Sequence, residues 1–155
     1  MQINHTCAFT GHRDRVSTSL RFRTIALIRE AAAEGYTCFI SGAALGYDLF
    51  CAQAVLALRN ECAIRLVCAV PFSAQAARWN SEARARYARV LEEADEVIVL
   101  SEEYTDSCLL ERNRFMVESS SLIIANYDGR IGGGTYHTIN LARRNGIEVR
   151  NCRDE

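Results

Sequence analysis

The sequence predicts an α/β fold with three layers, α/β/α, built around a mostly parallel sheet of five to six strands. Two observations carry this prediction. Short apolar runs alternate with longer amphipathic segments along the whole chain, which is typical of βαβ units. Three of the segments that follow apolar runs carry glycines, as strand-to-helix loops of such sheets often do. At 155 residues, 49% of them hydrophobic, we expect one domain over residues 1–155 with its own core.

The first third of the chain predicts two strands, each followed by a helix. The apolar run His5–Phe9 predicts the first strand, and Ser17–Glu34 predicts a helix that ends before Gly35, where a left-handed glycine belongs. Thr37–Ile40 predicts the second strand, and Asp48 is expected to cap a helix running to about Arg59. The apolar residues that share one face of the first helix are Leu20, Leu27, Ile28 and Ala31.

The rest of the chain repeats this alternation. Ile64–Val70 is almost continuously apolar, as expected of a central strand covered on both faces, and Pro71, the only proline, ends it. The polar stretch with Gln75 and Trp79 is expected to open a third helix that ends near Glu93. The remaining expected elements are strands at 97–100, 122–125 and 147–149, a helix that contains 112–114, and a helix over 136–145.

The three glycine-bearing loops are expected to meet. Right-handed crossovers bring every strand-to-helix loop of a parallel sheet to one edge, where open α/β sheets bind ligands. Glycine lets the backbone approach a ligand closely, and each loop opens a helix whose N-terminus favours anions. The run Gly132-Gly133-Gly134-Thr135 is the strongest signal, because three successive glycines cost folding entropy that a plain connection does not need. The sequence therefore predicts a Rossmann-like pocket for a phosphate-bearing, nucleotide-like ligand.

Composition restricts the chemistry further. All eighteen basic residues are arginine, so a Walker-type phosphate loop and Schiff-base chemistry are excluded within this chain, whereas bidentate phosphate clamping is not. Seven irregularly spaced cysteines, three of them (Cys7, Cys38 and Cys68) inside apolar runs, favour a reducing, cytoplasmic environment, and we expect no metal site. No apolar run approaches the roughly 20 residues that span a bilayer, and no signal peptide is recognised, so no membrane contact is expected.

Several of these features also have an ordinary structural explanation. Gly42 and Gly46 can simply make a tight turn, and Trp79 can be a packing residue instead of a stacking platform. His12 is expected to face the cleft because it follows the first strand, although a solvated turn residue fits the pattern as well. Arginines on the third helix alternate with glutamates and indicate a solvated face; they are Arg84, Arg86 and Arg89.

The motifs, taken in order, resemble a known family. They are Thr10-Gly11-His12-Arg13, the stretch Ser41 to Asp48, Pro71-Phe72 with Gln75 and Trp79, Arg112-Asn113-Arg114 with Met116, and Gly132 to Thr135. This order resembles the YpsA-like branch of the SLOG superfamily, which is related to DprA and to the LOG phosphoribohydrolases. The resemblance implies a Rossmann-like fold and a site for nucleotides, nucleotide sugars or ADP-ribose-like molecules. It implies ligand contacts from Gly11, Arg13, Ser41, Gly42, Arg112 and Gly132 to Thr135, with Asp48 shaping the second loop.

The candidate site residues come from both lines of reasoning. Phe72, Trp79 and Tyr104 are candidates for covering a base or ribose, and Arg13 and Arg112 for clamping phosphates. The full set of expected ligand-binding residues is Gly11, His12, Arg13, Ser41, Gly42, Gly46, Asp48, Phe72, Gln75, Trp79, Tyr104, Arg112, Asn113, Asp128, Gly132, Gly133, Gly134 and Thr135.

Three functions follow as hypotheses. The first is a module that senses or sequesters a nucleotide-derived ligand, with no cofactor required and with assembly into a homo-oligomer expected. The second is LOG-like hydrolysis of a nucleoside monophosphate. The LOG pattern P-G-G-x-G-T-x-x-E has Thr138 in place of its glutamate here, so Asp48 or Asp128 would have to supply the carboxylate beside Arg112. The third is DprA-like binding of single-stranded DNA, which a net charge of −1 disfavours.

Overall fold

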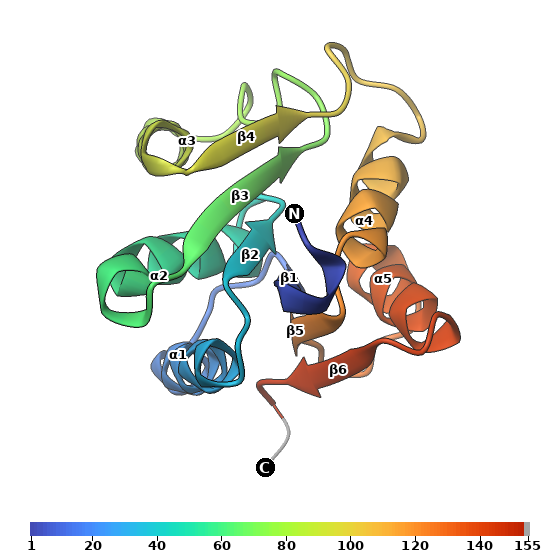
Figure 1. The fold of residues 1–155 in the computed structure, drawn as a ribbon. Helices are drawn as coiled ribbons and strands as arrows, with labels where there is room; N and C mark the ends of the chain where they lie inside the picture. The colour runs from blue at the N-terminus through green and yellow to red at the C-terminus, as the bar shows by residue number, and fades with distance from the viewer. Residues whose placement is uncertain (154–155) are drawn as a thin grey trace.

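The computed structural model describes residues 1–153 and contains one six-stranded sheet in which every strand pair is parallel (Figure 1). This confirms the predicted three-layer α/β fold. A short 3-10 turn, Ile3–His5, precedes the sheet. The strands are β1 (Thr6–Gly11), β2 (Cys38–Ser41), β3 (Arg65–Val70), β4 (Glu96–Val99), β5 (Leu122–Asn126) and β6 (Glu148–Asn151). The helices are α1 (Thr18–Ala33), α2 (Tyr47–Cys62), α3 (Ser81–Glu93), α4 (Cys108–Glu118) and α5 (Gly133–Arg144).

The order of strands places a crevice between β1 and β5. Across the sheet the strands run β4-β3-β2-β1-β5-β6, so the chain moves outward from β1 to β4 and then crosses back to the other side of β1. Ala8 of β1 pairs with Ile40 of β2 on one side and with Ile123 of β5 on the other. The connections that leave β1 and β5 therefore diverge, which is the switch point where open α/β sheets form ligand clefts.

Two apolar layers cover the two faces of the sheet. Helices α1, α2 and α3 lie on one face and α4 and α5 on the other (Figure 1). Because strand side chains alternate between faces, Cys7 and Phe9 pack in the core under α1 and α2, whereas Ala8 packs in the core under α4 and α5. Burial on both faces explains why the central strands are apolar at nearly every position.

Helix α1 matches its sequence signals closely. The Ser17 hydroxyl accepts a hydrogen bond from the Leu20 amide at 3.3 Å, and Gly35 follows the helix with φ +104°. Of the predicted apolar face, Leu20, Ile28 and Ala31 are buried and Leu27 is half-buried against the same core.

Three predicted helix starts were wrong. Helix α3 begins at Ser81, after a series of turns that contains Gln75 and Trp79, because the Asn80 side chain accepts the Ala83 amide at 2.8 Å and fixes the first turn there. Asp48 does not cap α2: Gly46 occupies the cap position and Asp48 lies inside the first turn. Helix α5 begins at Gly133, so that two of the three glycines belong to the helix.

Within residues 1–153, no helix has both the length and the apolar character needed to cross a bilayer.

Candidate functional site

A cleft of about 360 Å³ lies at the carboxyl ends of β1 and β5. Its walls come from the loop after β1, the loop after β2, the first turns of α4, and the glycine-rich start of α5. The lining residues are Thr10, Gly11, His12, Arg13, Asp14, Ala44, Asp48, Leu109, Arg112, Asn113, Arg130, Gly132, Gly133, Gly134 and Thr135.

The start of α5 forms one wall and exposes backbone amides. Gly132 and Gly133 have φ values of +91° and +87°, which side chains rarely adopt, and no side chain caps the helix. A Cβ atom built on either glycine would meet nothing within 4 Å, so the space above them is open to the cleft. An uncapped helix N-terminus carries free N–H groups and partial positive charge, and is therefore suited to an anion.

The glycines of the other two loops are required by packing. A Cβ on Gly11 would lie 2.4 Å from the ring of the buried Tyr47, and a Cβ on Gly42 would lie 2.5 Å from Nη1 of Arg112. Gly46, with φ +87°, would bring its Cβ within 2.6 Å of the Arg13 backbone. These three residues are glycine because backbone and side chains pass too close for any larger residue, so their presence is explained without a ligand.

Arg112 of α4 lines the cleft, and hydrogen bonds hold its side chain in place. Its side chain is only 4% exposed. Nη1 donates to the carbonyl oxygens of Gly42 at 2.9 Å and Ala69 at 3.4 Å, and Nε donates to Oδ1 of Asn113 at 2.8 Å. Burial lowers the pKa of the guanidinium, yet arginine stays protonated because its ordinary pKa is so high. Nη2 makes no hydrogen bond among residues 1–153, so its N–H groups can meet a ligand in the cleft.

Asp48 supplies an unpaired carboxylate to the same cleft. Its Oδ1 is buried and has no hydrogen-bond partner within the described residues, although Arg112 and Arg13 contribute favourable charge. Loss of solvation outweighs these arginines and raises the pKa of Asp48 to about 6. A carboxyl group with this pKa changes protonation near neutral pH, and it can accept or donate a proton to a bound molecule.

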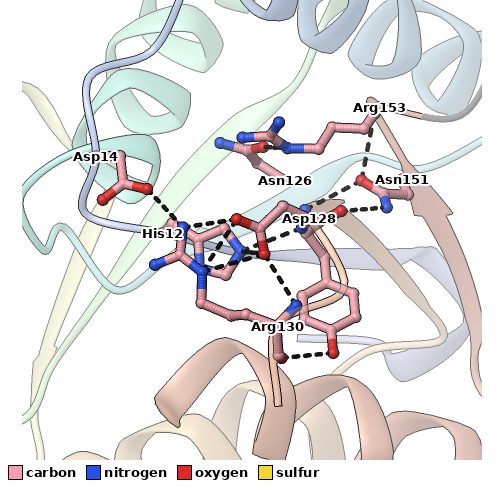
Figure 2. Close-up of polar contacts among 8 residues, drawn as sticks. His12, Asp14, Asn126, Asp128, Arg130, Asn151 and Arg153 are labelled. Carbon is pink, nitrogen blue, oxygen red and sulfur yellow. Dashed lines mark hydrogen bonds and ion pairs between the residues drawn. The ribbon is translucent and has the colours of Figure 1, made fainter. Parts of the chain in front are cut away.

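A second set of charges joins the loops after β1 and β5 at the mouth of the cleft (Figure 2). The Arg130 guanidinium donates to Asp128 at 2.6 Å and to Asp14 at 2.7 Å, and so connects residues 116 positions apart. These bonds hold the pKa of Asp128 far below its usual range. Nε2 of the buried His12 lies 3.2 Å from the Asp128 amide nitrogen. Burial lowers the His12 pKa, which favours the neutral ring that accepts this amide proton.

The structure brings most of the predicted residues to one place. Gly11, His12, Arg13, Asp48, Arg112, Asn113 and Gly132 to Thr135 line the cleft. Ser41, Gly42 and Gly46 lie behind its wall: the Ser41 hydroxyl donates to the Asp48 carbonyl at 2.7 Å and accepts the Ala43 amide at 3.0 Å. Asp128 lies beside the cleft through its contacts with His12 and Arg130.

Four predicted residues lie elsewhere. Phe72 and Tyr104 pack edge-to-face, with their ring centroids 5.4 Å apart, and line a separate depression together with Gln75. The Gln75 amide also donates to the Gly42 carbonyl at 3.3 Å, so it supports the second loop from outside the cleft. The Trp79 ring packs against the Tyr87 ring, with centroids 5.1 Å apart, so Trp79 acts as a packing residue here.

Sequence reasoning did not place five lining residues in the site: Thr10, Asp14, Ala44, Leu109 and Arg130. Leu109 could have been found, because it precedes Arg112 by three positions and therefore shares its helix face. Arg130 carries no local signal, since its partner Asp14 is distant in sequence.

A parallel sheet with a glycine-walled cleft at its switch point defines a Rossmann-like α/β protein. The chain belongs to the YspA SLOG family, whose model, YpsA, matches residues 8–147. The SPbeta prophage-derived protein YoqJ of Bacillus subtilis (strain 168) is 30% identical over 139 residues, which are 81% of this chain and 81% of YoqJ.

Solved structures at lower identity share the fold. DNA processing protein A (DprA) of Streptococcus pneumoniae has a TM-score of 0.67 and 18% identity over 94% of this chain, which spans about half (49%) of that DprA chain. DprA of Helicobacter pylori has a TM-score of 0.68 and 18% identity, covering 95% of this chain and 64% of its own. The molybdenum cofactor binding protein of Rippkaea orientalis has a TM-score of 0.60 and 19% identity, and the match covers 94% of this chain and 74% of that protein's chain.

Proposed function

We propose that this protein binds a phosphate-bearing, nucleotide-like ligand in the cleft between β1 and β5, and so senses or sequesters it. The observation that carries the proposal is the start of α5, where Gly132 and Gly133 present uncapped amides to open space. Arg13 and Arg112 line the same cleft, and guanidinium groups bind phosphate in a bidentate manner. The molybdenum cofactor binding protein, which shares this fold, binds a small molecule.

Calorimetry with AMP, ADP-ribose and NAD tests the proposal directly. Arg13 is the best position to change, because it is exposed and its side chain makes no hydrogen bond or ion pair among residues 1–153, although its charge also favours the ionised form of Asp48. Arg13→Ala should weaken AMP binding by about tenfold, the size of one charge-assisted hydrogen bond. Arg143→Ala is the matched control, since Arg143 is an exposed arginine at the far end of α5. If none of the three nucleotides binds at millimolar concentration, the proposal is wrong.

A second candidate function is N-glycosidic hydrolysis of a nucleoside monophosphate, and Asp48 is the observation in its favour. Asp128 is committed to Arg130 and does not line the cleft, whereas Asp48 lines it, and the buried Oδ1 of Asp48 has no hydrogen-bond partner among the described residues. A carboxyl with a pKa near 6 can activate water against an oxocarbenium-like centre. Chromatography for free adenine after incubation with AMP tests this. Intact AMP after long incubation with wild-type protein rejects it.

Binding of single-stranded DNA receives less support from the described residues. DprA of Helicobacter pylori binds single-stranded DNA, and the present chain shares its fold. Sequence-tolerant binding of this kind usually combines a basic groove with aromatic stacking platforms. Here Phe72 and Tyr104 lie in a depression separate from the cleft, and the net charge is −1. A salt titration with fluorescent oligonucleotides decides the matter, because a phosphate-tracking surface should bind measurably at low salt.

The proposal retains two expectations. We expect a homo-oligomer, which light scattering behind size-exclusion chromatography tests. We also expect a cytoplasmic location, where reducing conditions keep cysteine thiols free.

A further inference from the structure

A groove continues from the cleft along the seam between α4 and α5. Asn113 lines both hollows, and the Cβ position of Gly134 lies 3.6 Å from its Nδ2, so the two spaces share one wall. The groove has a volume of about 260 Å³ and runs past Thr138 toward Arg144. At 1.5 Å of rise per helical residue, Thr138 lies about 7.5 Å along the axis from Gly133. A molecule anchored at the start of α5 needs to extend by only about one sugar or phosphate unit to enter the groove.

The groove is cationic. The exposed guanidinium groups of Arg114 and Arg144 and the ring of His137 line it, and among the described residues its lining includes no carboxylate. Neither arginine side chain makes an ion pair or hydrogen bond within residues 1–153. The two guanidiniums are therefore uncompensated, in contrast to Arg130, which is shared between two carboxylates.

Thr138 gives an independent sign of a missing partner. Its side chain is 5% exposed, and its Oγ1 is buried with no hydrogen-bond partner among the described residues. A helical threonine usually donates to the carbonyl one turn earlier, as Thr24 does to Leu20 at 2.8 Å. Thr138 lines the groove, and its hydroxyl does not use this bond. An unsatisfied buried hydroxyl costs free energy unless something supplies the bond.

We propose that the groove between α4 and α5 is a second anionic subsite, which takes a further phosphate-bearing part of the ligand whose first phosphate lies at the start of α5. This inference rests on the proposed function and narrows it to ligands longer than a mononucleotide. Arg114 and Arg144 pair with the second anionic group, and the Thr138 hydroxyl donates to one of its oxygens. Leu110 and Leu141 line the groove beside the arginines and contact the apolar edge of the extension.

Affinities for a short and a long probe test the subsite. The wild-type chain should bind ADP-ribose at least tenfold more tightly than AMP, because only ADP-ribose carries a second phosphate. Arg144→Ala and Thr138→Val should each reduce this ratio while leaving AMP affinity within about twofold. Arg143→Ala should change neither affinity. Thermal unfolding of each variant confirms that it folds; Thr138→Val is close to isosteric and removes a hydroxyl that bonds to no described residue.

Each alternative result has a distinct meaning. If AMP binds and the ADP-ribose ratio is the same in wild type and both variants, the subsite is refuted and the proposed function stands. If neither nucleotide binds to the wild-type protein, both the subsite and the proposed function are refuted. If Arg144→Ala instead lowers the affinity for a single-stranded oligonucleotide, or halves the particle mass in light scattering, the groove is a nucleic-acid or subunit contact and the subsite is refuted.

Discussion

Replacing Asp48 by asparagine should stabilise the protein, and the gain should grow with pH. Burial raises the pKa of the Asp48 carboxyl from 3.8 to about 6, so the folded state binds a proton more tightly than the unfolded chain does. The sign follows from linkage: a carboxyl with a raised folded pKa destabilises the fold as pH rises, and the full penalty is present above the folded value. At 1.36 kcal/mol per pH unit, the rise in the Asp48 pKa lowers the free energy of unfolding by about 3 kcal/mol at high pH.

Two pH values separate this charge effect from any packing effect of the amide. By the same linkage, Asp48 should cost about 1 kcal/mol at about pH 4.5 and about 3 kcal/mol at about pH 7.5. Urea unfolding of wild type and Asp48→Asn at both pH values should therefore show the stabilising difference increase by about 2 kcal/mol. Asp106→Asn makes the same exchange of a carboxyl for an amide at an exposed position and is the matched control. If the difference in unfolding free energy between Asp48→Asn and wild type does not change with pH, burial does not raise the pKa of Asp48.

Three further changes test other parts of the structure. Gly11→Ala should destabilise the fold by about 1–3 kcal/mol in urea unfolding, since its Cβ would overlap the Tyr47 ring; wild-type stability would contradict the close approach. The His12 ring should titrate below 6.5 by NMR because burial disfavours its charged form, and a value above 6.5 would argue against a neutral ring. Iodoacetamide should label Cys62 first, as the one half-buried thiol among six buried ones; early labelling of Cys68, whose pKa burial raises to about 12, would contradict this.

Local patterns in the sequence were sufficient to predict the elements and the edge of the sheet where the site forms. The alternation of apolar runs and amphipathic segments predicted a mostly parallel sheet of five to six strands, and the glycines at 132–134 marked the segment that faces the cleft. Gly35 and Ser17 marked the ends of α1 because their effects act within one turn.

What the sequence could not predict depends on residues that meet only in the folded chain. Asp48 has the residue type of a helix cap, but α2 is capped two positions earlier, at Gly46, where the Tyr47 amide donates to the His12 carbonyl at 3.2 Å. Gly11 and Gly42 looked like ligand contacts, yet the side chains that exclude a larger residue there come from α2 and α4. Phe72 and Tyr104 were expected over the cleft and instead pack on each other, which no short-range pattern indicates.

The link from Arg130 to Asp14 and Asp128 limits how much negative charge the cleft can neutralise. Three guanidiniums line it, Arg13, Arg112 and Arg130, against the two carboxylates Asp14 and Asp48, which leaves an excess of one positive charge when all are ionised. Arg130 also pairs with Asp128, which does not line the cleft, so little of its positive charge is left to attract a ligand. Protonation of Asp48 in mildly acidic solution would double the excess. A ligand with a single phosphodiester, whose charge does not change in this range, should therefore bind more tightly as the solution is acidified toward about pH 5. A long polyanion carries more negative charge than the arginines of this cleft can neutralise.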